Sequence, residues 1–520
     1  MCGICGTIGF SDKHLLKRMT DALRHRGPDG EGFYLDHDAG LGIRRLKVID
    51  LVTGDQPIHN EENTLWVVYN GEIYNFKSLR AGLEAKGHRF YTRSDTEVIV
   101  HLYEEHGKDC VRYLEGMFVF ALWDKKKKEL FIARDRVGIK PLYYHFQDGA
   151  LRFSSELKSL IEDPAVTRDL DPLSLACFFS FLYIPAPRAI FKGVHKLPAA
   201  HTLHFKEGKL KLERYWDLEF PRRELKAVAQ AEHIEMIRRG LKDAVAKQLV
   251  SDVPLGVFLS GGIDSSAVVA MMREVTAGPI KSFSIGYSDK YSSFNELDDA
   301  ELVARHFGTE HSTFIVEPKI VDLLESVVWH LDEPFADSSS ILNFLISKET
   351  RREATVALSG IGGDEVFGGY PRYAGARLSL GYEKLPRWIR RAAAGLGDAL
   401  IREDLNSQNK GGRIKRFLRG GLLERRRRYI GWMRFFDDPG LAGLLDQDMQ
   451  KTLSGFDPEQ IHSDHFQRAP SADYLDQIFY TDLNTYLVDD LLSMADRMSM
   501  AHSLEVRVPF CDYKLIELSA

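Results

Sequence analysis

The sequence predicts two domains of different fold class. The first is an α+β domain of two stacked sheets with helices outside, and the second is an α/β domain with a doubly wound parallel sheet. A length of 520 residues is too long for one core and leaves room for an appended helical segment. Apolar residues come in short runs up to about residue 215, whereas strand-like and helix-like segments alternate farther on.

In the first domain, residues 1–215, Gly, Pro and Asp separate the apolar runs, which is typical of strands joined by tight turns. Two segments have helical periodicity, at about 76–86 and 95–105. The expected strands are 41–51, 64–72, 116–124, 129–135, 141–146 and 150–155. A charged stretch that contains a proline follows, and it predicts a linker at 216–230.

The second domain is predicted to span residues 231–520. Its apolar runs of strand length alternate with helical segments, and this order favours parallel strands joined by crossover helices. The expected strands are 253–260, 280–287, 311–316 and 354–359, and the expected helices are 265–275, 298–308 and 320–331.

Composition narrows the function. A net charge of −6 and a pI of about 6.3 give no electrostatic case for nucleic acid. No apolar run approaches the ~18 residues of a membrane span, and the first residues lack a secretory signal. The five cysteines are scattered, which fits reduced thiols better than a disulfide framework. We therefore expect a cytoplasmic protein that acts on small molecules.

The stretch "LSGGIDSS", residues 259–266, is the strongest phosphate-binding signal. It follows a strand and opens a helix, so Gly261 and Gly262 let backbone N–H groups approach an anion at the helix N-terminus. Asp264 can hold Mg²⁺ against phosphate oxygens. The chain lacks G-x-x-x-x-G-K-[ST], so the stretch indicates pyrophosphate binding rather than transfer of a γ-phosphoryl group. The alternative is a Gly-rich turn without a ligand.

Motifs along the whole chain resemble those of one family. "MCGICGTIGF", "RHRGPDG", "YNGEIYN", "SDTE" and "ARDRVGIKPLYY" resemble the glutaminase half of glutamine-hydrolysing asparagine synthetases. "LSGGIDSS", "DEPFADSS", "LSGIGGDEVFGGY" and "DRMSMAHSLEVRVPFCD" resemble the synthetase half, in the family's order. The resemblance implies a class II amidotransferase domain with the αββα sandwich of N-terminal nucleophile (Ntn) hydrolases, followed by an ATP-pyrophosphatase domain.

The resemblance assigns a glutamine site. After removal of Met1, Cys2 becomes the nucleophile and its α-amine the general base, a role suited to an amine with a pKa near ~7.7. Asn70 and Gly71 supply the oxyanion hole. Three residues are expected to bind the substrate's charged groups: Arg45, Glu72 and Asp95. Alternatively, Asn70 and Gly71 form a turn and Asp95 caps a helix.

The resemblance also assigns an ATP site with Mg²⁺. Asp264 and Asp337 are the expected metal ligands, although Asp337 could instead cap a helix. The expected ATP-binding residues are Leu259, Ser260, Gly261, Gly262, Asp264, Ser265, Ser266, Ile285, Ser359 and Gly360.

The implied reaction joins both sites. Glutamine hydrolysis supplies ammonia, which passes internally to an acyl-adenylate of a carboxylate, with L-aspartate the expected acceptor, and AMP and pyrophosphate are released. Two departures weaken the assignment of aspartate: Ile361 replaces an acidic residue common in the family, and the sequence stops at Ala520, before a family lysine. An amidotransferase for another carboxylate, or a synthetase-impaired glutaminase or sensor, therefore remains an alternative. A homodimer is left open.

Overall fold

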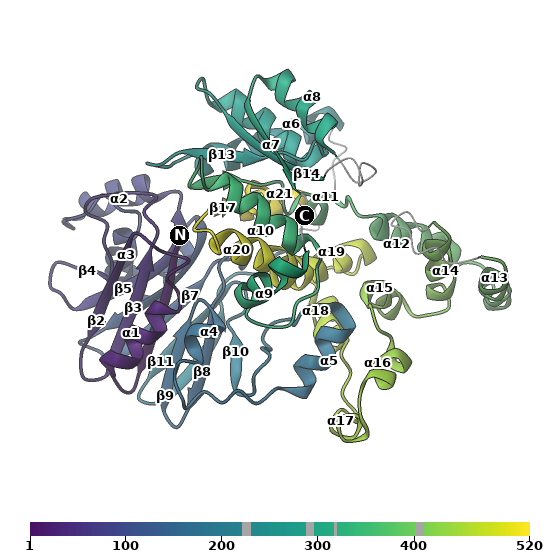
Figure 1. Ribbon diagram of the computed structural model, residues 1–520, viewed down its shortest axis with the longest axis horizontal. Coiled ribbons are helices and arrows are strands. Elements are labelled where there is room, and N and C mark those ends of the chain that lie inside the picture. The colour runs from purple at the N-terminus through teal and green to yellow at the C-terminus, as the bar shows by residue number, and fades with distance from the viewer. Residues whose placement is uncertain (221–229, 288–295, 317–319, 402–409) are drawn as a thin grey trace.

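The computed structural model describes residues 1–220, 230–287, 296–316, 320–401 and 410–520 (Figure 1). Residues 221–229 of the predicted linker lie outside this part of the chain. Among the helices described, none combines the length and apolar character needed to cross a bilayer.

The N-terminal half contains two six-stranded antiparallel sheets, as the sequence predicts. The first has the order β10-β8-β9-β1-β3-β2, and the second has the order β12-β11-β7-β6-β5-β4. The first sheet comprises β1 (Cys2–Ile8), β2 (Gly30–Leu35), β3 (Ala39–Arg45), β8 (Tyr143–Gln147), β9 (Ala150–Ser154) and β10 (Val194–Lys196). The second comprises β4 (Ile58–His59), β5 (Leu65–Ile73), β6 (Gly116–Asp124), β7 (Glu129–Arg134), β11 (His201–Lys206) and β12 (Lys209–Arg214).

Helices cover the outer faces of these sheets, which gives the expected αββα layers (Figure 1). Apolar side chains from both inner faces, such as Ile4, Val68 and Val119, form the core between them. The helices of this half are α1 (Lys13–Asp21), α2 (Phe76–Glu84), α3 (Glu97–His106), the 3₁₀ helix η1 (Gly107–Tyr113), α4 (Leu157–Leu160) and α5 (Pro172–Phe181). The sequence analysis did not predict α1, where the Asp12 carboxylate caps the backbone N–H groups of His14 and Leu15.

The C-terminal half contains the predicted parallel sheet, with the order β15-β14-β13-β16-β17. Its strands are β13 (Leu255–Phe258), β14 (Lys281–Tyr287), β15 (Glu310–Val316), β16 (Val356–Leu358) and β17 (Glu505–Arg507). The helices around the sheet are α6 (Gln230–Gln248), α7 (Ile263–Val275), α8 (Leu297–Phe307), α9 (Ile320–Leu331), α10 (Ser339–Thr350), α11 (Gly363–Phe367), α20 (Ser493–Met500), the 3₁₀ turn η4 (Pro509–Cys511) and α21 (Tyr513–Ser519). The sequence analysis did not predict β17, which is only three residues long.

A helical segment separates β16 from β17 in the sequence, and part of it extends away from the rest of the protein (Figure 1). It follows α11 and ends in a π-helical turn that leads into α20. Its elements are α12 (Pro371–Tyr382), α13 (Arg387–Leu400), α14 (Lys410–Gly420), α15 (Arg425–Met433), α16 (Asp438–Leu444), α17 (Gln447–Thr452), α18 (Gln460–Arg468), α19 (Tyr474–Asn484) and η3 (Tyr486–Leu492).

Buried ion pairs join the two halves. Arg26, between α1 and β2, bonds Glu156 of its own half at 2.8 Å and pairs with Asp496 of α20 at 2.8 Å. Lys140 also pairs with Asp496, at 3.2 Å. Because these side chains are almost fully removed from solvent, each charge depends on its partners for compensation.

We predict that Asp496→Asn destabilises the contact between the halves. The amide would leave Lys140 without the charge of Asp496 and Arg26 with Glu156 alone, and removal of one partner from a buried pair typically costs about 3–5 kcal/mol. The measurement is differential scanning calorimetry of the full chain. The matched control is Glu62→Gln, which breaks the exposed Lys126–Glu62 pair and should leave the melting temperature unchanged. Equal melting temperatures for the two variants would contradict the prediction.

Candidate active sites

Cys2 lies at the start of the central strand β1, opposite Arg45 of β3. Its thiol is buried, and its backbone N–H donates to Asn70 Oδ1 at 2.9 Å. Burial raises the pKa of the thiol, while the N-terminal ammonium, a backbone hydrogen bond at Leu46 and the Arg45 guanidinium oppose the rise. A buried thiol of raised pKa needs an adjacent base before it can act as a nucleophile.

Asn70 and Gly71 lie side by side on β5. The Asn70 Nδ2 group is buried without a hydrogen-bond partner, so it can donate to an atom that enters the site. At Gly71, with φ of +156°, a Cβ would lie 2.1 Å from the Met117 carbonyl oxygen of the neighbouring strand β6. Glycine is therefore required at this point, and the two residues form part of a strand rather than the alternative turn.

A small cavity brings the predicted glutamine-binding residues together. Cys2, Arg45, Gly71, Glu72 and Asp95 all line it, and its volume is 20 Å³. Asn70 does not line the cavity, but it contacts Cys2 directly through the hydrogen bond described above. Met1 is also a lining residue, so its removal would enlarge the space.

Hydrogen bonds from neighbouring residues fix the positions of Arg45 and Asp95 in the cavity. Arg45 Nη1 bonds Asp55 at 2.6 Å, and Arg45 Nη2 donates to the carbonyl of Asp50 at 2.6 Å. Asp95 accepts from the Tyr69 hydroxyl and the Ile73 N–H, both at 2.9 Å. Helix α3 has Thr96, not Asp95, as its N-cap residue, so the helix-cap alternative for Asp95 does not apply. The Asp95 carboxylate is thus positioned at the cavity by two donors.

Glu72 connects the cavity to the C-terminal half. Burial raises the pKa of Glu72 well above its usual range, and the nearby Glu505 carboxylate raises it further. One Glu72 oxygen lies 3.6 Å from Arg507 Nη2, and the other is buried without a hydrogen-bond partner. Glu505 in turn pairs with the Met1 ammonium at 3.1 Å and with Arg507 at 2.6 Å. The sequence analysis did not select Glu505 or Arg507, although both belong to the "SLEVRVPF" motif.

A second, larger cavity of 930 Å³ lies beside the parallel sheet, next to the segments that follow β13 and β16. This is the sheet edge at which doubly wound folds bind ligands. Eight of the predicted ATP-binding residues line it: Leu259, Ser260, Gly262, Asp264, Ser265, Ile285, Ser359 and Gly360. Gly261 and Ser266 belong to the same strand-to-helix segment without lining the cavity.

Glycines allow this segment to pack closely. Gly261 has φ of +82°, and a Cβ there would lie 2.6 Å from Asp299 Cβ of α8. A Cβ on Gly360 would lie 2.9 Å from the Ser265 N atom. Helix α7 begins directly after Gly262, so the first N–H groups of α7 are next to the cavity. These N–H groups can serve as donors for an anion.

Two carboxylates face the larger cavity, and their chemistry fits Mg²⁺. Asp264 and Asp364 both line it, and neither forms an ion pair with a basic side chain of the described residues. Burial raises the pKa of Asp264 to about 6, and the charge of Asp364 adds to this rise. A divalent cation with oxygen ligands would relieve this repulsion. Asp364 was missed, although "GGDE" follows the predicted strand 354–359 and was a usable signal.

Asp337, the other predicted metal ligand, is not among the lining residues of this cavity. Its carboxylate accepts from the Ser339 N–H at 2.8 Å, where α10 begins. The N-cap residue of α10 is Ser338, so Asp337 lies one residue before the cap and bonds the first N–H of the helix without being the cap itself. The structure thus brings Asp264 together with Asp364 rather than with Asp337.

Ile361 and Glu365 also line the larger cavity. Ile361 brings no ionisable group to it. Burial raises the pKa of Glu365 to about 7, while a hydrogen bond from the Tyr370 hydroxyl opposes the rise. The sequence analysis did not select Glu365, which is an acid poised to exchange a proton near neutral pH.

Comparison with known proteins agrees with this two-site arrangement. Residues 1–216 match the family described as "Glutamine amidotransferase domain", and residues 236–520 match "Asparagine synthase". Asparagine synthetase [glutamine-hydrolyzing] 1 of Bacillus subtilis is 34% identical over 99% of this chain and 81% of its own length. Asparagine synthetase [glutamine-hydrolyzing] 3 of the same organism is 35% identical over 99% and 80%. The chain belongs to the glutamine-hydrolysing asparagine synthetase family.

Proposed function

We propose that this chain hydrolyses glutamine through a Cys2 thioester and uses the ammonia to convert an ATP-activated carboxylate, L-aspartate, into its amide. The observation that carries the proposal is the pairing of two sites in one chain. In one half, a buried cysteine lies beside Asn70, whose Nδ2 group has no hydrogen-bond partner among the described residues. In the other half, two carboxylates face a Gly-rich cavity. The cysteine and the Asn70 amide suit acyl transfer. The two carboxylates and the Gly-rich segment suit binding of a nucleoside triphosphate with a divalent cation.

The first half-reaction requires removal of Met1. While Met1 is present, the Cys2 nitrogen is a peptide nitrogen whose N–H donates a hydrogen bond to Asn70. Once Met1 is removed, this nitrogen becomes an α-amine that can take the thiol proton. The thiolate attacks the glutamine side-chain carbonyl, and the Asn70 Nδ2 and Gly71 N–H groups stabilise the oxyanion. The amide nitrogen takes the proton back and leaves as ammonia. Water then cleaves the thioester to release glutamate and restore the thiol.

Arg45, Glu72 and Asp95 recognise glutamine in this proposal. The guanidinium is suited to bind the α-carboxylate, and the two carboxylates are suited to bind the α-ammonium. Both carboxylates have raised pKa values because of burial, so an arriving cation would supply the compensation that they lack.

In the second half-reaction, the α7 N-terminus and the serines of "LSGGIDSS" hold the phosphates of ATP. Asp264 and Asp364 are the residues that would hold Mg²⁺, and we retain Asp337 as a predicted ligand that the cavity geometry does not support. Bound Mg²⁺ neutralises charge on the phosphate oxygens. The acceptor carboxylate attacks the α-phosphorus, pyrophosphate leaves, and ammonia displaces AMP to form the amide.

Ammonia must travel between the two sites without meeting bulk water, where it is mostly protonated at neutral pH. The buried Arg507–Glu72 contact beside the small cavity, which joins the two halves at 3.6 Å, supports a path along this boundary. The five free cysteines are all buried, and retention of a reduced Cys2 fits a cytoplasmic location.

We predict that Cys2→Ala reduces glutamine hydrolysis by roughly 10⁴-fold or more, because the variant has no nucleophile. Amide synthesis from added ammonia should continue, since the second cavity contains no part of this cysteine. The measurement is glutamate release beside pyrophosphate release. Cys110→Ala, which removes a buried thiol that lines neither cavity, is the control and should retain both activities. Normal glutamate release by Cys2→Ala would refute the nucleophile assignment.

We predict that ATP is cleaved to AMP and pyrophosphate. Asp264→Asn and Asp364→Asn should each slow this cleavage by at least about 10²-fold, since even the outer partners of metal ligands typically account for 10–100-fold in affinity. Both variants should hydrolyse glutamine normally. Asp337→Asn tests the remaining predicted ligand, and an unchanged rate would assign Asp337 to the start of α10. Formation of ADP and phosphate would overturn the assignment of the second site.

We predict that the chain converts aspartate slowly, because Ile361 cannot accept a proton during amide formation. Ile361→Glu should raise asparagine formation at least about tenfold, within the range of general-base effects. Ile361→Leu is the matched control and should not change the rate. Glutamate and pyrophosphate release across a panel of carboxylates tests other acceptors. Rapid asparagine formation by the unaltered chain would remove the need for the acidic residue.

A further inference from the structure

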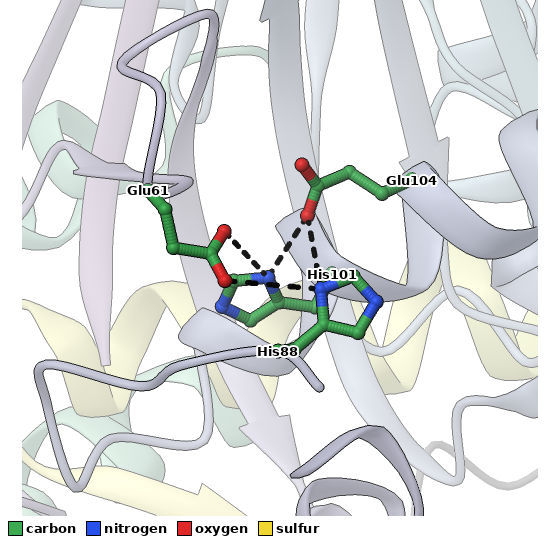
Figure 2. A group of neighbouring side chains, drawn as sticks. All are labelled: Glu61, His88, His101 and Glu104. Atoms are coloured by element: carbon green, nitrogen blue, oxygen red, sulfur yellow. Dashed lines mark hydrogen bonds and ion pairs between the residues drawn. The ribbon is translucent and has the colours of Figure 1, made fainter. Parts of the chain in front are cut away.

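Two histidines and two glutamates converge in the glutaminase half (Figure 2), and none of them lines either cavity. Glu61 follows β4, His88 lies between α2 and α3, and His101 and Glu104 are one turn apart on α3. One ligand atom from each of the four residues can be chosen so that all four lie within 4.8 Å of one another.

The distances between these atoms suit a small tetrahedral cation. Tetrahedral Zn²⁺ with bonds of about 2.0–2.1 Å holds its ligand atoms roughly 3.3 Å apart. His101 Nδ1 lies 2.9 Å from Glu104 Oε2 and 3.6 Å from Glu61 Oε2. His88 Nδ1 lies 3.4 Å from Glu104 Oε2 and 3.9 Å from Glu61 Oε1. The widest separation among the four ligand atoms is at most 4.8 Å, so side-chain movements of up to about 1.5 Å would bring the set to the required spacing.

Both histidines present Nδ1 to the cluster, and each turns its other nitrogen toward a further carboxylate. His88 Nε2 is hydrogen-bonded to Glu105 at 3.1 Å, whereas His101 Nε2 lies 3.6 Å from the buried Glu97, beyond hydrogen-bond distance. Histidines that bind metal almost always donate their other N–H to such an acceptor, which fixes the ring and the tautomer. The Glu105 contact would leave His88 Nδ1 with a lone pair for a metal ion, and Glu97 is the acceptor toward which His101 Nε2 points.

The two glutamates are oriented in the same way. Glu104 Oε1 accepts from the amide of Asn60 at 2.7 Å, while its Oε2 atom faces the histidines. Glu61 Oε1 accepts from the Arg89 N–H at 2.8 Å, while its Oε2 atom faces His101. Glu61, His88 and Glu104 are therefore each held by a hydrogen bond to a partner outside the cluster.

We propose that Glu61, His88, His101 and Glu104 bind a Zn²⁺ ion in the glutaminase half. Two imidazole nitrogens and two carboxylate oxygens form a ligand set that Zn²⁺ accepts, and four protein ligands make a closed site with a structural role. The ion would tie the segment between α2 and α3 to α3 and to the end of β4. That segment also carries Ser94 and Asp95, so the ion would stabilise one wall of the glutamine cavity.

A proton competes with the metal ion at this position. Burial alone would lower the pKa of His101, but the neighbouring carboxylates of Glu104, Glu97 and Glu61 outweigh burial and raise the pKa to about 9. A cluster without metal would therefore be an ion-pair network around a protonated His101. Measurement of metal binding distinguishes the two states.

The test is isothermal titration calorimetry of Zn²⁺ into the full chain after chelator treatment, without ATP or Mg²⁺. His101 is fully buried, so the test variants are His88→Gln and Glu61→Gln, whose side chains are partly exposed. We expect the unaltered chain to bind one Zn²⁺ at this site, and both variants to bind it at least about 10²-fold more weakly. Glu105→Gln, which alters an outer partner, should weaken binding by about 10–100-fold.

His106→Gln is the matched control, because His106 lies at the end of α3 and outside the cluster. It should bind Zn²⁺ like the unaltered chain. Zn²⁺ should raise the melting temperature of the unaltered chain and of His106→Gln but not of His88→Gln. Bound Co²⁺ should give the strong visible absorption of a tetrahedral site. Absence of Zn²⁺ binding, or equal binding by His88→Gln, Glu61→Gln and His106→Gln, would overturn the proposal.

Discussion

The arrangement of the molecule depends on buried ion pairs between its two halves. Arg26 and Lys140 of the glutaminase half share Asp496 of α20, and Lys196 pairs with Glu333 at 2.6 Å. Burial of charge is unfavourable unless each group finds its partners. The contact is therefore selective: a displacement of one half would expose uncompensated charge, so the two sites are held in a defined relation.

The same network reaches the glutamine cavity. Arg507 of β17 lies between Glu505 and Glu72. Burial alone would raise the pKa of Glu505, but Arg507 and the N-terminal ammonium outweigh burial and lower the pKa to about 2. Glu72 receives less compensation, and its pKa is raised. A synthetase strand thus contributes to the electrostatics of the glutaminase site. A change in the charge or position of the Glu72 carboxylate would act directly on Arg507 of β17. Strand β17 is the edge strand of the parallel sheet.

Both sites contain carboxylates that lack compensation in the protein alone. Burial and neighbouring carboxylates raise the pKa values of Glu72 and Asp264. These groups destabilise the isolated protein, and a cationic ligand would remove the penalty. The charged groups of the interface are compensated by protein partners, whereas the carboxylates of the two sites have room for a cationic ligand to compensate them.

Local sequence determined much of this architecture. Short apolar runs predicted the stacked sheets, and the alternation of strands and helices predicted the parallel sheet, because both patterns reflect burial along each element. The motifs and their order likewise indicated Cys2 as the candidate nucleophile and "LSGGIDSS" as the candidate phosphate-binding segment. The edge strand β17 was not predicted, since three residues are too short for a periodic pattern and its partner β16 is more than 140 residues earlier.

Tertiary structure alone decided which charged groups meet. The sequence suggested Asp337 as a partner for Asp264, whereas the fold places Asp364 beside it in the cavity. The fold also brings Glu61 close to His88 and His101, and Arg507 close to Glu72. These residues are too far apart in the sequence for a local pattern to predict the contacts. The physical reason is that an isolated carboxylate in a sequence has no fixed partner. Its role follows from the burial and the neighbouring charges that only the packed chain supplies.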